Sequence, residues 1–414
     1  MEKTYELLKK YAKMMAEQEY STGEYSILMI DTGEGVYATK YGADLNDLKP
    51  EEVEKLNIEA LPTSESGMRA MVYSQTPYCQ KALREGRTFK PSLDDMAQII
   101  GPAAVIADTS SGSVGKSLKK ALGQNAGCLV LRGKEPDGKG KGYTLTVGRN
   151  LYEAVVAMTV LEKSAEITYL ADRIGGVKYL NPAETRLMRL IYKKKYSKAE
   201  ETAKTAETAE GVISDTKDNA VADLSGENTR EQLLRSQLVE YGKKLVKSGL
   251  VQGTWGNLSI RLDDQYMLVT PSGLDYMRLT PSDMVKVDIH TLKYEGNLKP
   301  TSERGLHGEI YKRRPDVGAV IHTHSKYACV FAAALKPLPV VDEAMKNVFG
   351  WEIPLAEYGL PGTKKLMKNT VDALGENMGC IMSHHGMIAC GKDMETAFEN
   401  CAKVEECGKK YLRL

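Results

Sequence analysis

Histidine is scarce and unevenly placed in this chain of 414 residues. All six histidines lie in the second half, starting at His290. The second half places four of them in two close pairs, His322 with His324 and His384 with His385. Imidazole is the commonest metal ligand in proteins. A histidine-based metal site is therefore excluded from the first half and expected only in the second.

The sequence also lacks excess charge, long apolar runs and paired cysteines. A formal net charge of +1 gives no electrostatic reason to bind nucleic acid or an anionic membrane. No segment reaches the apolar length that a membrane span needs, and the charged, amphipathic start does not resemble a signal peptide. Seven scattered cysteines without Cys-x-x-Cys spacing are typical of reduced thiols. We expect a cytoplasmic protein with no nucleic-acid partner and no membrane partner.

A change in composition divides the chain. Residues 196–229 are rich in Ala, Glu, Thr and Lys and contain few large apolar side chains. Such a stretch buries too little surface to offset its ordering entropy, so we interpret it as a linker; an exposed helix is the alternative. The predicted domains are residues 1–195 and 230–414, each long enough to bury its own core.

Three short segments of the first half recur in the second half in the same order, which predicts a tandem duplication. "LPTSESGMRAMVY" at 61–73 matches "KPTSERGLHGEIY" at 299–311, so that Glu65 aligns with Glu303 and Tyr73 with Tyr311. Residues 112–133 resemble residues 359–386, and the segment near residue 50 resembles the one near residue 280. Where the second copy has histidines, the first has "SQTPYCQ" and "VLRG". The first copy is therefore expected to lack a metal site.

Hydrophobic periodicity predicts irregularly alternating helices and strands in the second copy. Helices are expected over residues 229–250 with Thr229 as N-cap, 302–315, 328–335, 363–376 with Thr363 as N-cap, and 393–414. Short strands are expected in "NLSIRL", "YMLVTPSG", "VGAVIHTHS" and "GCIMSHHGMIAC". This alternation favours helices on both faces of a mixed sheet.

The strand "VGAVIHTHS" carries the first half of the candidate metal site. Side chains at positions i and i+2 of a strand point to the same side, so His322 and His324 lie side by side. A tetrahedral zinc site needs a third ligand, and "SHHG" supplies one. We favour His385, which adjoins Gly386 at the expected turn, and expect His384 to be packed. His290 and His307 have no partner pattern and are interpreted as structural.

Glu303 and three polar turns complete the candidate site. Glu303 precedes the histidine strand and could be a fourth ligand and proton-transfer base; a helix-capping glutamate is the alternative. The turns at 253–257, 270–273 and 300–302 collect hydroxyls, glycines and backbone N–H groups, which together can bind phosphate. Each could also be an ordinary turn. Beside a metal site, they indicate a small phosphorylated substrate.

In this order, the motifs resemble the class II aldolase/adducin family, and within it the L-fuculose-phosphate aldolases, across residues 230–414. The resemblance implies an α/β fold of two tandem three-layer α/β/α domains, each with a mixed, mostly antiparallel central sheet, the first degenerate. It also implies one Zn²⁺ bound by His322, His324, His385 and Glu303, with Glu303 as acid and base. The implied phosphate- and substrate-binding residues are Thr254, Gly256, Asn257, Ser272, Gly273, Thr301 and Ser302.

The implied reaction is zinc-dependent cleavage of a ketose 1-phosphate, similar to L-fuculose 1-phosphate, into dihydroxyacetone phosphate and an aldehyde. Zinc would stabilise the enediolate that forms as the carbon–carbon bond breaks, so no Schiff-base lysine is needed. A sugar-phosphate 4-epimerase or a methylthioribulose-phosphate dehydratase on the same metal site is the alternative. Adducin-type members use the fold for assembly, and we expect such a structural role for the first domain.

Two positions depart from the family pattern. A family tyrosine that follows the histidine strand is replaced by "VVDEAMKNVFG", with Asp342 and Glu343 near its position. For a second family tyrosine, contributed by a neighbour's C-terminal tail, Tyr411 is the candidate, with a packing role as the alternative. The family implies a homo-oligomer, here a dimer that forms a pseudo-fourfold ring in which the first domain supplies a wall of the site.

Overall fold

The division of the chain into two units is visible in the computed structural model, which describes residues 2–17, 26–61, 67–110, 113–134, 140–194, 226–251 and 255–414. Unit 1 comprises the described residues up to 169 together with 179–194. Unit 2 comprises 170–178 and the described residues from 226 onward. Most of the predicted linker lies outside the described residues. Among the residues that are described, no helix has the length and apolarity to cross a membrane.

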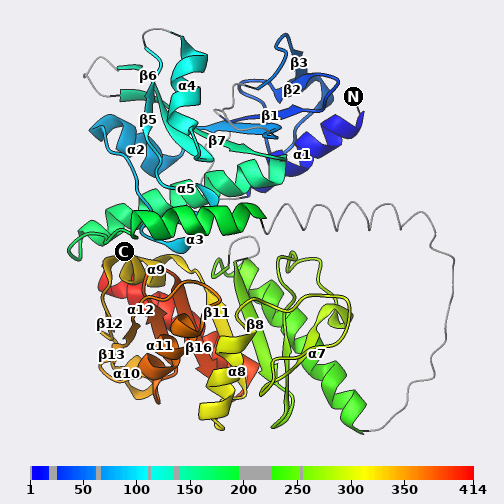
Figure 1. The fold of residues 1–414 in the computed structure, drawn as a ribbon, viewed down its shortest axis with the longest axis vertical. Helices are drawn as coiled ribbons and strands as arrows, with labels where there is room; N and C mark the ends of the chain where they lie inside the picture. The colour runs from blue at the N-terminus through cyan, green and yellow to red at the C-terminus, as the bar shows by residue number, and fades with distance from the viewer. Residues whose placement is uncertain are drawn as a thin grey trace, which may run out of the picture. The chain divides into compact units, whose positions relative to one another are not determined.

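Unit 2 is built on a seven-stranded mixed sheet (Figure 1). The strands follow the spatial order β10-β9-β8-β11-β16-β15-β14, and every pair is antiparallel except β14 with β15. The five residues of β11 are all buried, as expected for the predicted central strand. The strand bounds are β8 (Gly256–Arg261), β9 (Tyr266–Val269), β10 (Val285–Asp288), β11 (Ala319–Thr323), β14 (Leu355–Ala356), β15 (Gly379–Met382) and β16 (Gly386–Gly391).

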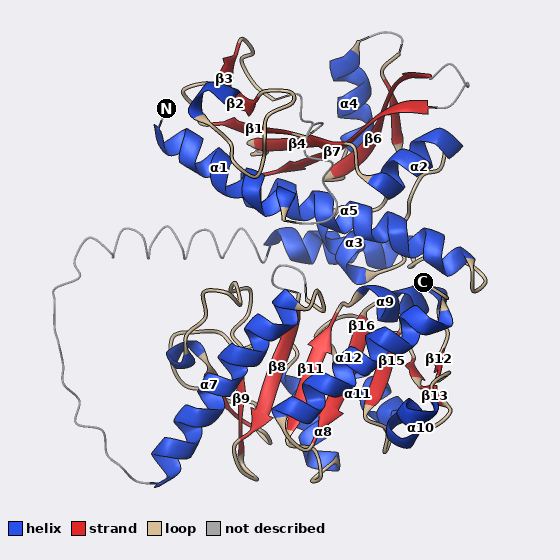
Figure 2. Ribbon diagram, turned by 180° about the vertical axis from the view of Figure 1, so that it is seen from behind, coloured by secondary structure: helices blue, strands red, loops and turns tan. Residues whose placement is uncertain are grey.

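Helices cover both faces of this sheet (Figure 2). On one face α7 (Gly226–Lys247), α9 (Lys326–Ala334) and α12 (Met394–Tyr411) pack together. On the other, α8 (Arg304–Arg313) and α11 (Lys364–Leu374) bury Ile310 and Val371 against Val320 and Ile388. The remaining elements of unit 2 are η3 (Pro281–Asp283), β12 (Leu338–Pro339), α10 (Glu343–Phe349) and β13 (Glu352–Ile353). The expected mixed α/β architecture is confirmed for this unit.

The two predicted N-caps have different outcomes. The Thr363 hydroxyl accepts a hydrogen bond from the backbone N–H of Leu366 at 3.3 Å, so the cap of α11 is confirmed. The Thr229 cap is wrong, because α7 begins at Gly226 and Thr229 lies inside the helix. The helix therefore begins three residues before the predicted cap.

Unit 1 contains a second seven-stranded sheet with a matching strand order, β3-β2-β1-β4-β7-β6-β5. Again only the last pair, β5 with β6, is parallel. Each strand therefore has a counterpart in unit 2, with β4 in the place of β11. The elements are α1 (Glu2–Ala16), β1 (Ile27–Asp31), β2 (Val36–Thr39), η2 (Pro50–Glu52), β3 (Val53–Leu56), β4 (Ala70–Ser74), α2 (Pro77–Glu85), α3 (Asp94–Ile99), β5 (Ile106–Asp108), α4 (Val114–Leu122), β6 (Gly127–Lys134), β7 (Gly140–Gly148) and α5 (Leu151–Asp172).

The correspondence extends to single hydrogen bonds. The carboxylate of Glu162 accepts the backbone N–H groups of Tyr78 and Cys79 at the start of α2, at 2.6 and 3.0 Å. In unit 2, Glu405 accepts the N–H groups that open α9, those of Tyr327 and Ala328, at 2.8 and 3.0 Å. Each carboxylate thus caps, from the long closing helix, the helix that follows the central strand.

These contacts correct one part of the sequence alignment. Tyr78 follows Tyr73 at the same spacing at which Tyr327 follows His322, so Tyr73 occupies the position of His322. The predicted match of Tyr73 with Tyr311 is wrong, because Tyr73 lies on a central strand and Tyr311 on helix α8. The described residues that lead into β4 include no counterpart of α8. Glu65 lies outside the described residues.

Replacing Glu405 with glutamine is expected to destabilise the protein by about 1–3 kcal/mol. The amide retains the shape of the side chain but loses the charge that strengthens its hydrogen bonds to the N-terminus of α9. Glu399→Gln on the same helix is the control, because Glu399 is exposed and its one ion pair within the described residues is with Lys403, one turn away. Urea denaturation measures both variants; equal destabilisation would contradict the capping role.

Candidate metal centre

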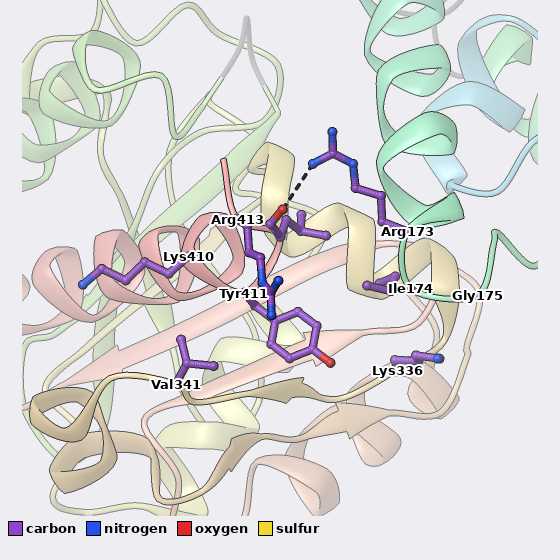
Figure 3. Close-up of a pocket in the computed structure, with 9 residues that line it drawn as sticks. Arg173, Ile174, Gly175, Lys336, Val341, Lys410, Tyr411 and Arg413 are labelled. Carbon is purple, nitrogen blue, oxygen red and sulfur yellow. Dashed lines mark hydrogen bonds between the residues drawn. The ribbon is translucent and has the colours of Figure 1, made fainter.

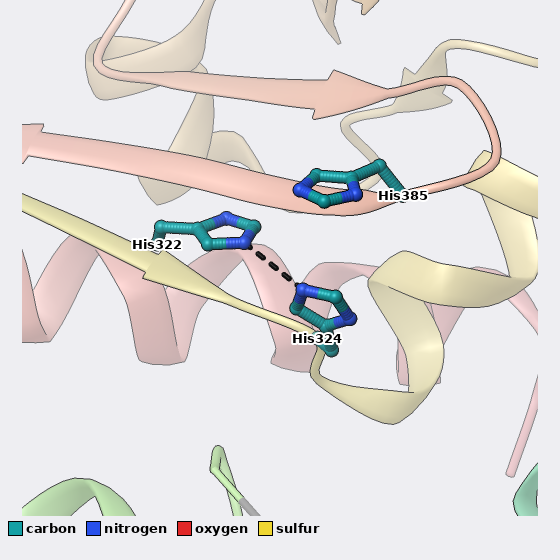
Figure 4. Close-up of side chains that lie close together, drawn as sticks. All are labelled: His322, His324 and His385. Carbon is teal, nitrogen blue, oxygen red and sulfur yellow. Dashed lines mark hydrogen bonds between the residues drawn. The ribbon is translucent and has the colours of Figure 1, made fainter. Parts of the chain in front are cut away.

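Three imidazoles converge at the end of the central strand of unit 2 (Figure 4). His322 lies on β11, His324 directly follows this strand, and His385 lies in the turn between β15 and β16. Because β16 pairs with β11, the turn brings His385 to the end of the histidine strand. Ligand atoms of the three side chains lie within 4.8 Å of one another. The structure thus brings together the three histidines chosen from the sequence.

Backbone contacts fix the orientation of His322. Its Nδ1 lies 2.9 Å from the carbonyl oxygen of Met387, which is a hydrogen-bond acceptor, so Nδ1 carries the proton. Nε2 is left with its lone pair directed at the cluster, 3.0 Å from Nε2 of His324. Burial lowers the pKa of His322 to about 3, against the opposing effect of Glu303. The ring is therefore neutral at pH 7 and can donate its lone pair.

The carboxylate of Glu303 reaches into the same cluster. Oε1 lies 2.8 Å from Nε2 of His385, and Oε2 lies 3.3 Å from Nε2 of His322. The side-chain amide of Asn257 donates to Oε2 at 3.1 Å. Glu303 precedes α8 but its side chain makes no capping hydrogen bond, so the alternative capping role is not observed.

Glu303 is ionised despite being buried. Burial opposes ionisation, but the neighbouring imidazoles of His322 and His385 and the hydrogen bonds from His385 and Asn257 hold the pKa of Glu303 well below its usual value. Three imidazole nitrogens beside an anionic oxygen are a donor set that suits zinc, whereas calcium and magnesium prefer oxygen ligands throughout. The cluster can therefore hold a metal ion, and its nitrogen ligands favour a transition metal over calcium or magnesium.

The other histidines of unit 2 lie outside the cluster. His384 is buried against Tyr358 at a ring-centroid distance of 5.3 Å, and its φ of 59° places it in the left-handed region. This conformation turns the chain between β15 and β16, so that His385 rather than His384 faces the cluster. His290 lies in a turn, with Nε2 3.2 Å from the carbonyl oxygen of Asp264.

His307 belongs to a buried polar network that the sequence analysis missed. The Ser259 hydroxyl lies 2.7 Å from Nδ1 of His307 and 2.7 Å from the hydroxyl of Tyr311. All three side chains are buried, and burial lowers the pKa of His307 to about 4. Glu303 immediately before α8, and His307 and Tyr311 within it, are spaced four residues apart, and Asn257 and Ser259 are two apart on β8. These two periodicities are the signal that could have predicted the network.

Two of the three predicted phosphate-binding turns lie side by side. An isolated bridge pairs Pro271 with Pro300, and the backbone N–H of Thr301 donates to the carbonyl of Thr270 at 3.1 Å. Gly273 has a φ of 78°, which glycine adopts without strain. Ser302 is exposed beside the buried Thr301 and Glu303. Thr254 lies outside the described residues, and the phosphate-binding role of these turns stays a prediction.

Gly256, also in the predicted set, is required by close packing against the histidine strand. Its φ is +134°, and a Cβ there would lie 2.7 Å from the carbonyl oxygen of His322. Gly256→Ala is expected to destabilise the protein by about 2–4 kcal/mol, combining backbone strain with overlap. Gly249→Ala is the control, because Gly249 has a φ of +72° with no atom within 4 Å of the added Cβ. Equal effects in chemical denaturation would show that packing against His322 is unimportant.

The side chains at the positions that depart from the family pattern make contacts outside the histidine cluster. Asp342 accepts the N–H of Ala344 as the N-cap of α10 and pairs with Lys410 at 2.7 Å. Glu343 has an 85% exposed side chain that pairs with Lys346. The ring of Tyr411 packs edge-on against Phe331 at 5.5 Å. None of these three side chains joins the histidine cluster.

Known proteins match the part of the chain that carries this site. Residues 236–412 match the family described as Class II Aldolase and Adducin N-terminal domain. The 5-methylthioribulose-1-phosphate/5-deoxyribulose-1-phosphate aldolase of Rhodospirillum rubrum is 37% identical over 180 residues, which are 44% of this chain and 80% of that protein. The L-fuculose phosphate aldolase of Escherichia coli K12 is 34% identical over 183 residues, 44% of this chain and 84% of that protein. A solved L-fuculose 1-phosphate aldolase aligns with a TM-score of 0.41 and 38% identity, over 43% of this chain and 84% of that one.

Three imidazoles that meet a buried carboxylate at the end of a central strand are a ligand set of the kind that holds a catalytic metal ion. The chain belongs to the class II aldolase/adducin family. The relatives are named aldolases, which are carbon–carbon lyases, so the expected enzyme class is confirmed. The family match lies within unit 2.

Proposed function

We propose that unit 2 cleaves a ketose 1-phosphate into dihydroxyacetone phosphate and an aldehyde, with zinc held by His322, His324, His385 and Glu303. The observation that carries the proposal is the convergence of three imidazoles on one buried carboxylate. A zinc ion held there would draw electron density from the oxygens of the substrate and so stabilise the negative charge that develops as the bond breaks.

Glu303 has the position of the proton-transfer group. Its carboxylate is ionised, buried and oriented by the amide of Asn257, so it can accept the proton that a substrate hydroxyl loses as the carbon–carbon bond breaks. It then returns that proton to the carbon from which the aldehyde has left. Burial of Glu303, at 6% exposure, keeps bulk water from competing for that proton. No lysine is required for this chemistry.

Asn257 has a second role in substrate binding. Its Oδ1 is buried and has no hydrogen-bond partner among the described residues. An unsatisfied buried acceptor costs free energy, which a substrate hydroxyl can recover by donating to it. We assign the phosphate to the set Thr254, Gly256, Asn257, Ser272, Gly273, Thr301 and Ser302, in which hydroxyls and backbone N–H groups are the donors.

The names of the relatives favour an aldolase over the epimerase and dehydratase alternatives. The sugar phosphates in these names differ. One acts by its name on 5-methylthioribulose 1-phosphate and 5-deoxyribulose 1-phosphate, and another on L-fuculose phosphate. These substrates share the ketose 1-phosphate end. The zinc-loaded full chain should therefore release dihydroxyacetone phosphate from at least one of them in a coupled assay. Formation of a C4 epimer, or loss of water without cleavage, would contradict the aldolase proposal.

We also propose that the chain is a tandem duplication with domains at 1–195 and 230–414, the first of which is structural. The shared strand order and the matching capping carboxylates, Glu162 and Glu405, support this. Tyr73 stands where the second copy has His322, so the first domain lacks the ligand set. A dimer of such chains would form a pseudo-fourfold ring with two zinc sites. Sedimentation equilibrium of the full chain tests the dimer.

A further inference from the structure

Unit 2 contains a cavity of about 970 Å³ that shares no residue with the histidine cluster or the polar turns (Figure 3). Three segments line it: residues 173–175, which follow α5; Lys336 and Val341, on either side of β12; and residues 410–413 at the end of α12. Its volume is typical of sites for small molecules.

The cavity concentrates positive charge. Arg173, Lys336, Lys410 and Arg413 line it, and no aspartate or glutamate does. Lys410 is neutralised by Asp342 at 2.7 Å and Glu406 at 2.8 Å. The other three cations form no ion pair with the described residues. The chain as a whole carries a formal charge of only +1, so the concentration does not follow from general basicity.

Hydrogen bonds join the three segments that carry these cations. Nη1 of Arg173 donates to the carbonyl oxygen of Leu412 at 3.2 Å, which joins two of the three segments. The N–H of Lys178 donates to the carbonyl of Ala333 at 2.8 Å and joins the third. Gly175 has a φ of +105°, and a Cβ there would lie 3.2 Å from Nζ of Lys336, so glycine leaves room for that ammonium group. Like charges that line one cavity repel one another, and an anion bound among them would offset that repulsion.

We propose that this cavity binds a small phosphate-bearing anion with at least two negative charges, at a site separate from the catalytic one. Guanidinium groups present paired N–H donors that match phosphate oxygens, and the lysine adds a point charge. Ile174 and Val341 give the cavity an apolar side for an organic portion of the ligand. The proposal does not depend on the aldolase reaction.

Isothermal titration calorimetry of the full chain with pyrophosphate tests the site. The triple variant Arg173→Gln, Lys336→Gln, Arg413→Gln is expected to weaken this binding at least 30-fold. The matched control is Lys247→Gln, Lys364→Gln, Lys365→Gln, which removes three exposed charges elsewhere on unit 2 and should change the dissociation constant less than threefold. Melting temperatures of both triple variants verify folding, and Lys336→Glu alone provides a second variant with the same expected direction.

Three outcomes would overturn the proposal. Equal binding by the cavity triple variant and the unsubstituted chain would place pyrophosphate elsewhere. Equal weakening by the control would mean that overall charge, not the cavity, attracts the anion. A loss that appears only with an acidic polypeptide such as polyglutamate, and not with pyrophosphate, would make the cavity a protein-binding surface. If the chain cleaves sugar phosphates, an unchanged KM in the cavity triple variant separates this site from the catalytic one.

Discussion

Glu303→Gln is expected to lower kcat for ketose 1-phosphate cleavage by about 10²–10⁴-fold, the usual effect of removing a proton-transfer group. Glutamine has nearly the same shape but cannot accept and return a proton. The variant loses one proposed ligand but keeps all three imidazoles, and three histidines are a sufficient protein ligand set for a catalytic zinc, so it should still contain zinc. Steady-state kinetics, together with metal analysis of the same sample, measures both properties.

The control for this variant lies on α8, the helix that follows Glu303. Glu309→Gln removes a carboxylate whose ion pairs within the described residues are with its neighbours Lys312 and Arg313. It should leave kcat within about twofold, since surface ion pairs contribute little. A Glu303→Gln enzyme with full zinc content and undiminished kcat would refute the assigned role of this carboxylate.

His385→Ala is expected to remove the metal and the activity together. The loss of one imidazole leaves an incomplete ligand set, and we expect zinc affinity to fall at least ~10²-fold, beyond the effect of losing an outer hydrogen-bond partner. After dialysis, the unsubstituted chain should retain one zinc per chain and the variant almost none. One rather than two is expected because unit 1 has no histidine.

His290→Ala is the matched control for the metal measurement. His290 is exposed and does not belong to the cluster of His322, His324 and His385, so its variant should keep the full zinc content. Retention of zinc by His385→Ala, or loss from His290→Ala, would contradict the ligand assignment.

The three histidines of the metal site can be predicted from local sequence patterns. Alternation along a strand places His322 and His324 on the same side, and this does not depend on the rest of the fold. The glycine that follows His385 predicts the turn. The sequence predicts Asn257 in the phosphate-binding set, and the structure adds a contact that the sequence does not predict, from the side-chain amide of Asn257 to the carboxylate of Glu303. That contact joins residues 46 positions apart and depends on how β8 packs against α8. Periodicity shows which side chains share a face of each element, but it does not show that these two faces meet.

The sequence alignment of the two halves is wrong just before the central strand, where the second half has the longer connection. The "TSE" match predicts that Tyr73 corresponds to Tyr311, but in the second half α8 lies between this motif and the central strand. Strand register and the capping carboxylates locate the true counterpart, His322. Similarly, the cationic cavity is lined by residues near 173, 336 and 410. These residues are far apart in the sequence, so no local pattern predicts that they lie together.

The two units share a helix cap but not the histidines. Glu162 retains the helix-capping contact of Glu405 although the first unit has no histidine. The helix after the central strand needs its cap in both units, because its N-terminal N–H groups must be satisfied when buried. The imidazoles are needed only where a metal is to be bound.

The most direct test of the central claim is release of dihydroxyacetone phosphate from L-fuculose 1-phosphate and 5-deoxyribulose 1-phosphate, before and after removal of metal by a chelator. The account predicts release by the zinc-loaded chain, loss of activity in the metal-free chain, and recovery on addition of one equivalent of zinc. Undiminished cleavage by the metal-free chain would contradict it, as would a zinc-loaded chain that releases no dihydroxyacetone phosphate from either sugar.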